Sequence, residues 1–146
     1  MLALTLAWPA LAEPTSSLPH YARITYRVTY GEGGIVGGRA VQELRHDGSR
    51  YSMSSSMETV GIVRLFKEAR LINVSTGSIV AGGLRPDEFS ITRNNDKTEK
   101  AMFDWAANEV RLDNGNQYPL EPGTQDLLSL FGQLAILPLD SAVISI

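Results

Sequence analysis

Two of the aspartates and both histidines of this 146-residue chain are the side chains whose types could support chemistry. Asp104 and Asp126 could act as a general acid and a general base if their surroundings separated their pKa values. His20 lies in a segment rich in proline and serine, and His46 lies beside Asp47 in an expected turn. A catalytic or zinc site needs several such groups at one place, and their spacing gives no sign of that. The histidines are therefore interpreted as surface turn residues.

Both aspartates also have a structural interpretation, which the sequence favours. Asp126 lies in the first turn of an expected helix, where a carboxylate complements the positive end of the helix dipole and the free N–H groups. Thr124 is expected to be the N-cap residue. Asp104 lies between Phe103 and Trp105, on the strand face opposite the two rings. We therefore predict that Asp126→Ala lowers the stability modestly.

Other sequence signals of enzymatic chemistry are weak. The chain has no cysteine, which excludes disulfides, thiol nucleophiles and iron–sulfur ligation. The serines at 52–56 do not fit the G-x-S-x-G nucleophile elbow. The glycines at 31–38, GEGGIVGG, do not fit G-x-G-x-x-G and indicate a hairpin with a β-bulge instead. We expect a protein that is not an enzyme and that has no cofactor or metal, with a hydrolase as the least favoured alternative.

The charge balance argues against nucleic acid as a partner. Thirteen Lys and Arg residues against 16 Asp and Glu residues give a formal net charge of -3. Binding to phosphates requires clustered Lys and Arg. The one compact basic feature is Arg64 with Lys67 and Arg70, which Glu68 interrupts, and it is interpreted as a solvated face.

The N-terminus predicts export. Residues 1–12 form a short apolar run that ends in Ala10-Leu11-Ala12, a cleavage pattern of the A-x-A type. The run is shorter than the roughly 20 residues that span a bilayer, so no transmembrane span is expected. No Lys or Arg precedes it, and a buried strand or helix is the alternative. We expect a signal peptide cleaved after Ala12, a linker at 13–20 and a periplasmic location.

Alternating apolar and polar residues predict a sheet over one domain, residues 21–146. Residues 22–30 alternate without interruption, and an Asp-Gly turn at 46–49 separates two further alternating runs. Strand patterns recur about every ten residues, and no βαβ alternation is present. Residues 61–67 are ambiguous between a helical turn and a strand. The expected fold is mainly β, an antiparallel meander.

A single apolar helix is expected at about 124–137. Its leucines and Phe131 cover most of its circumference, so it should be buried on most sides. Twisted antiparallel strands curl into an open half-barrel, and the helix would lie in the concave side of that curved sheet. Residues 142–146 look like the start of a strand. We therefore expect that C-terminal strands are missing and that one flank of the helix is bare.

Five large side chains at inward-facing positions could line a lipid-sized cavity. They are Tyr26, Tyr30, Phe103, Trp105 and Phe131. Large apolar pockets with few polar groups are typical of ligand sites. The alternative is that these side chains form an ordinary packed core without a ligand.

Four short pieces in this order carry a resemblance: YRVTYG at 26–31, GGLRP at 82–86, FDW at 103–105 and QDLLSL at 125–130. The chain resembles the bacterial envelope family catalogued as domain of unknown function 3108. The resemblance implies an exported, periplasmic, mostly β protein and supplies no catalytic residue. Within these pieces, Gly83, Pro86, Asp104 and Asp126 are interpreted as structural motif residues.

The expected function is therefore an envelope function without catalysis. The protein would bind an apolar ligand, a lipid or another envelope protein through the curved sheet, as comparable half-barrels of lipoprotein-sorting proteins hold acyl chains. The alternative is a scaffolding envelope protein with a packed core and no ligand. The comparison with lipoprotein-sorting proteins rests on fold alone.

Overall fold

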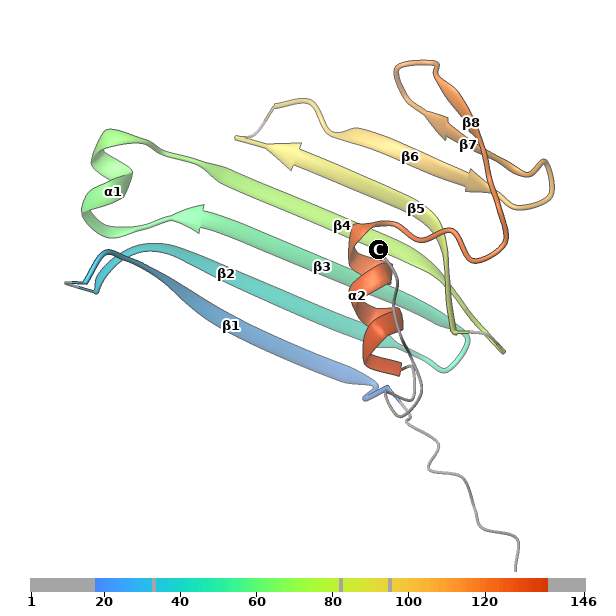
Figure 1. The fold of residues 1–146 in the computed structure, drawn as a ribbon, viewed down its shortest axis with the longest axis horizontal. Helices are drawn as coiled ribbons and strands as arrows, with labels where there is room; N and C mark the ends of the chain where they lie inside the picture. Colours follow the sequence, from blue (N-terminus) through green and yellow to red (C-terminus); the bar gives the residue numbers. More distant parts are fainter. Residues whose placement is uncertain (1–17, 33, 82, 95, 137–146) are drawn as a thin grey trace, which may run out of the picture.

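One antiparallel sheet makes up most of the molecule (Figure 1). The computed structural model describes residues 18–136 except 33, 82 and 95. Eight strands follow one another in chain order as a meander. They are β1 (Tyr21–Tyr30), β2 (Ile35–His46), β3 (Arg50–Thr59), β4 (Arg70–Val80), β5 (Gly83–Arg93), β6 (Glu99–Asp104), β7 (Glu109–Leu112) and β8 (Gln117–Pro119), with helices α1 (Gly61–Phe66) and α2 (Leu127–Ile136). The prediction of a mainly β, open meander is confirmed.

The first two hairpins follow from their turn residues. Val28 pairs with Gly38 and Thr29 with Val36, so Gly37 is the extra residue of a β-bulge, as the glycine pattern predicted. In the β2–β3 turn, the Asp47 carboxylate accepts the backbone N–H groups of Arg50 and Ser49, each at 2.8 Å. These bonds lower the pKa of Asp47 to about 2.

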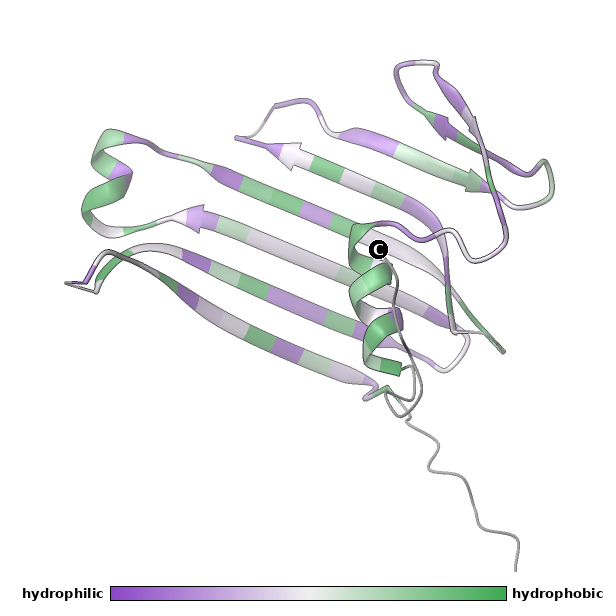
Figure 2. Ribbon diagram, viewed as in Figure 1, coloured by the Kyte–Doolittle hydropathy of each residue, from purple (hydrophilic) through white to green (hydrophobic). Residues whose placement is uncertain are grey.

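The sheet has an apolar face and a polar face, because side chains alternate along each strand. Residues that pair directly share a face, and Leu44 pairs with Ala22 on one side and with Met53 on the other. The hydropathy colouring alternates along β1 and β2 in the same way (Figure 2). The opposite face carries ion pairs such as Arg23 with Glu43, 3.1 Å apart.

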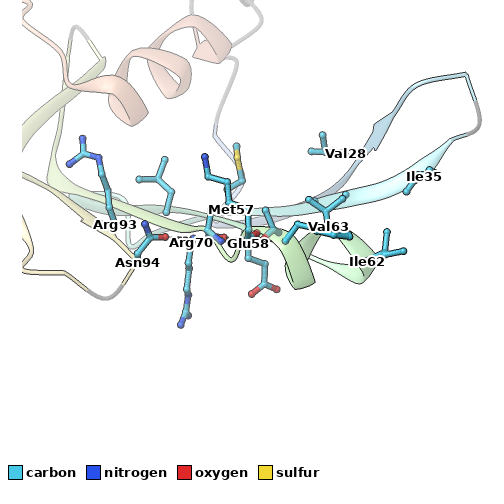
Figure 3. Close-up of a pocket in the computed structure, with 16 residues that line it drawn as sticks. Val28, Ile35, Met57, Glu58, Ile62, Val63, Arg70, Arg93 and Asn94 are labelled. Atoms are coloured by element: carbon cyan, nitrogen blue, oxygen red, sulfur yellow. Dashed lines mark hydrogen bonds between the residues drawn. The ribbon is translucent and has the colours of Figure 1, made fainter.

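Helix α2 lies on the concave, apolar side and packs on β3, β4 and β5 (Figures 1 and 3). Leu44, Tyr51 and Leu84 form the buried cluster beneath it, and Ile136 at the end of the helix packs against them. The prediction that an apolar helix lies in the concave side of the sheet is confirmed.

Two details of that helix were predicted wrongly. The helix begins at Leu127 rather than near 124, because Asp126 caps it. The Thr124 hydroxyl donates to the carbonyl of Glu121 at 2.7 Å, so Thr124 is not the N-cap.

The helix is also not buried on most sides. Leu128, Ser129 and Gly132 face the sheet, whereas Leu130 and Phe131 are exposed. Small residues let the helix axis approach the sheet closely, since a Cβ at Gly132 would lie 2.6 Å from Leu84 Cδ1. Within the part of the chain that the structure describes, this flank of the helix is bare, as expected.

The ambiguous segment at 61–67 contains α1, which lies on the convex side of the sheet (Figure 3). Val63 Cγ2 lies 3.2 Å from where a Cβ would stand at Gly37 on β2. Within the described part of the chain, no helix has the length and apolar character needed to cross a bilayer. The expected signal peptide (1–12), most of the linker (13–20) and the expected strand start (142–146) lie outside the described residues.

Candidate functional site

A buried polar network fastens α2 to the sheet. Asp126 Oδ1 accepts the backbone N–H groups of Leu128 and Ser129, at 2.8 and 2.9 Å, so the carboxylate is the N-cap. Its second oxygen, Oδ2, accepts the Ser75 hydroxyl of β4 at 2.6 Å. One side chain therefore satisfies the helix end and a strand residue together. Asp126 thus has a structural role that extends from the helix end to a strand.

Tyr51 of β3 completes the network. Its hydroxyl lies 3.1 Å from Ser75 Oγ, and the residue is 3% exposed. Burial raises the pKa of Tyr51 to about 12, since a phenolate would lose its hydration there. The ring packs on Gly77, where a Cβ would lie 2.7 Å from Tyr51 Cε1 and 2.8 Å from Pro86 Cα and would collide with the Arg85 carbonyl. Gly77 is therefore required by close packing.

Two side chains next to the network, Gln125 and Gln133, form hydrogen bonds with the unpaired edge of β5. Strand β6 pairs with β5 only along Glu88–Ile91, so the backbone of Leu84 lacks a strand partner on that edge. Gln133 Oε1 accepts the Leu84 N–H at 2.8 Å, and Gln125 Nε2 donates to the Leu84 carbonyl at 2.7 Å. Gly83 has φ +120, and a side chain there would occupy the place of the Gln133 amide. Glycine at 83 is thus explained by the docking of α2.

Trp105 joins the same region. Its indole Nε1 donates to the Pro86 carbonyl at 2.7 Å, and its ring stacks with Phe103 at a centroid distance of 6.4 Å. Asp104 points away: its carboxylate pairs with Arg111 at 3.2 Å and accepts the N–H of Ala107. Three of the four sequence pieces behind the resemblance therefore meet around the docked helix.

These groups are not arranged for catalysis. Ser75, the serine bonded to Asp126, is 0% exposed, so no substrate can reach its hydroxyl. His20 and His46 stack on each other at a centroid distance of 4.5 Å, and their ring nitrogens lie near the backbone carbonyls of His46 and Leu18. Among the described residues, no three His, Cys, Asp or Glu side chains are grouped as a metal site would need.

The opposite end of the sheet is open. A groove of about 760 Å³ lies where β1–β5 meet α1 (Figure 3). Val28, Met57 and Arg93 project on the side that carries α2, whereas Glu58 and Arg70 point to the other side. Among the described residues, the groove is lined by Val28, Ile35, Gly37, Gly38, Met57, Glu58, Thr59, Ile62, Val63, Phe66, Lys67, Ala69, Arg70, Leu71, Arg93 and Asn94.

The groove continues onto an exposed apolar surface. Ile24, Tyr26 and Val28 of β1 are each almost half exposed, and Met57 beside them is 49% exposed. Tyr26 and Met57 both pair with Ala40 of β2, so they share the concave face. This face is therefore apolar well beyond the part that α2 covers.

The side chains predicted to line a ligand cavity are not brought together. Tyr26 lies on the open concave surface, and the side chain of Tyr30 lies outside the described part of the structure. Phe103 and Trp105 pair near Pro86, and Phe131 is on the exposed side of α2. The four whose side chains the structure describes, Tyr26, Phe103, Trp105 and Phe131, do not line the groove, and contact of the five with a ligand stays a prediction.

Sequence reasoning missed the groove because its apolar residues come from unremarkable stretches. Met57 ends a serine-rich strand, and Ile62 and Phe66 lie in the segment that was ambiguous. One signal was available in the sequence. Residues 61–66 are mostly apolar, yet neither a strand period nor a helix period assigns them to a buried face.

A comparison with protein families gave one match. The family model described as "Protein of unknown function (DUF3108)" matches residues 25–143. Searches of curated proteins and of solved structures gave no match.

Proposed function

Because the chain belongs to the family of proteins of unknown function DUF3108, whose description assigns no activity, we propose a function from the groove. The protein is an exported bacterial envelope protein that binds an apolar ligand, the acyl chain of a lipid, against the open end of its curved sheet. Binding, not catalysis, is its role.

The observation that carries this proposal is the open apolar groove of about 760 Å³. Ligand pockets of proteins measure roughly 300–1,000 Å³ and are lined mostly by apolar side chains with a few polar groups. Here Val28 and Met57 supply apolar surface on the concave side (Figure 3), Leu71 shares that face because it pairs with Met57, and Arg93 and Asn94 also line the groove. Exposed apolar side chains gathered in this way mark interaction sites.

A cation beside the apolar part of the groove suits a head group. Arg93 lines the groove and projects on the same side of the sheet as Met57 (Figure 3). An acyl chain along Val28 and Met57 would place its polar end beside this guanidinium. This arrangement supports an amphipathic lipid over a purely apolar molecule.

Native mass spectrometry of the protein purified from a bacterial periplasm tests the proposal. We expect a bound species of lipid mass. Met57→Ser should lower its occupancy, whereas Met102→Ser should not, because Met102 has a similar exposure of 46% but does not line the groove. A protein free of lipid in every preparation would favour the scaffolding alternative.

Export is tested separately by sequencing the N-terminus of the protein from the periplasmic fraction. Residues 1–12 support cleavage after Ala12, so the mature chain should begin at Glu13. A chain recovered only from the cytoplasm with Met1 intact would contradict an envelope function.

A further inference from the structure

The end of the molecule formed by α1 and the β1–β2 turn exposes large apolar side chains. Leu65 is 84% exposed and Phe66 is 86% exposed, and no residue of α1 is buried. Ile62 of α1 and Ile35 at the start of β2 are more than half exposed at the same end (Figure 1). We call these four residues the tip. Large apolar side chains are seldom this exposed, and an exposed cluster of them marks an interaction site.

Segment 61–70, which carries Ile62, Leu65 and Phe66 of the tip, is basic. Arg64, Lys67 and Arg70 against Glu68 alone give segment 61–70 a formal charge of +2, whereas the whole chain carries -3. Arg64 pairs with Glu68 at 2.6 Å. Within the described part of the chain, no ion pair involves Lys67 or Arg70. The formal charge of this segment is therefore opposite in sign to that of the whole chain.

Hydrogen bonds on either side of α1 hold this helix in place. The Thr59 hydroxyl donates to the Lys67 carbonyl and accepts the N–H of Ala69, both at 2.9 Å. The Val60 N–H donates to the Gly37 carbonyl at 3.1 Å. These hydrogen bonds hold the segment that carries α1 in place. Its backbone is therefore already ordered, and binding through its apolar side chains would lose no further backbone entropy.

We propose that the tip docks the protein on an anionic lipid bilayer. Leu65 and Phe66 enter the boundary between head groups and acyl chains, and Lys67 and Arg70 contact lipid phosphates. Apolar side chains next to Lys and Arg are the usual composition of segments that lie in a membrane interface. This inference goes beyond ligand binding and does not depend on it, although the groove shares Ile35, Ile62 and Phe66 with the tip.

Charge favours a bilayer over a second copy of the chain. A two-fold symmetric contact would set the tip against itself. It would bring Lys67 and Arg70 close to the same cations of the partner, and like charges in a contact are unfavourable. Anionic phosphates neutralise these cations instead.

Flotation with vesicles tests the docking. The full chain is mixed with vesicles of phosphatidylglycerol and, separately, of phosphatidylcholine. We expect binding to phosphatidylglycerol that weakens as salt is added. The double variant Leu65→Ser/Phe66→Ser should bind at least about tenfold more weakly, since it removes the apolar surface that would be buried. The control Leu130→Ser/Phe131→Ser changes the same residue types on the exposed side of α2 and should bind as the original does.

A second variant reports insertion directly. Phe66→Trp should shift its fluorescence to shorter wavelength with phosphatidylglycerol vesicles, and Phe131→Trp should not. Three results would overturn the proposal: no vesicle binding by the original chain, equal binding by both double variants, or a dimer without vesicles that Leu65→Ser/Phe66→Ser dissolves. Leu65→Ser alone, at a residue that does not line the groove, should weaken docking while lipid stays bound in the groove, and Met57→Ser should show the reverse pattern.

Discussion

The two ends of the sheet share one apolar face but differ in what covers it. At the covered end, around Tyr51 and Gly77, α2 lies on the sheet and a buried network joins Asp126 to Ser75. At the open end, around Met57 and α1, the described residues place no element over the concave face, and a groove remains.

The difference teaches that apolar pattern alone does not decide which part of a sheet is covered. Both ends alternate in the same way, so the pattern offers a helix equal apolar surface at either. At the covered end, Ser75 and the backbone of Leu84 bond the polar side chains of the helix segment, and Gly132 lets the helix approach Leu84 closely. Directional hydrogen bonds fix the position that the hydrophobic effect leaves open.

The largest effect is expected from the same substitution made at each end. Gly77→Ala should lower the free energy of unfolding by about 3 kcal/mol or more, because the new Cβ collides with backbone atoms of Arg85 and Pro86. Gly37→Ala at the open end should cost less than about 1 kcal/mol, because it meets only Val63 Cγ2, at 3.2 Å. Urea unfolding measures both, and equal losses would remove the distinction between the ends.

The next effect comes from the network itself. Asp126→Ala should cost about 2–3 kcal/mol, because the helix loses its cap and Ser75 loses its buried acceptor. Asp126→Asn keeps an oxygen acceptor and should cost roughly half of that. Thermal and urea unfolding of both variants measure this. A loss below about 0.5 kcal/mol for Asp126→Ala would show that α2 is held by apolar packing alone.

The covered end should also destabilise at alkaline pH through Tyr51. Its pKa is about 12 in the folded protein against 10.0 for an ordinary tyrosine. The unfolded chain then releases this proton first, so the stability is intact below pH 10 and falls as the pH rises from about 10 to 12. Urea unfolding across this range should show a steeper fall for the original chain than for Tyr51→Phe. Parallel curves would contradict the burial of this hydroxyl.

The smallest effect is expected at the open end. Met57→Ser should change the free energy of unfolding by less than about 0.5 kcal/mol, because the side chain is half exposed. Met53→Ser, on the same strand and the same face, should cost about 1–2 kcal/mol, because Met53 packs on Gly132 of α2. Comparable losses in urea unfolding would mean that the open end is packed in solution.

The strands were predictable because their signal is local. Residues 22–30 alternate, and Asp47-Gly48 forms the turn between β2 and β3, where Asp47 also bonds the following N–H groups. The start of α2 was misplaced because Thr124 and Asp126 are both good capping residues. The choice of Asp126 depends on Ser75, which lies 51 positions away in the sequence.

The apolar character of the concave surface was predictable from the sequence, but the position of the groove was not. The expectation of an apolar concave surface with one bare helix flank agrees with the structure, yet Trp105 and Phe103 belong to the covered end. The sequence pattern of inward-facing aromatic residues is the same whether they pack in a core or line a cavity. Which of the two occurs depends on the element that covers that part of the sheet.

The sequence by itself determined the period-two strands, their turns and one C-terminal helix, since each follows from neighbouring residues. Only the tertiary structure decided which face of α2 is buried and which end of the sheet stays open. These follow from contacts between distant residues, Asp126 with Ser75 and Gly132 with Leu84, whose geometry no local pattern contains.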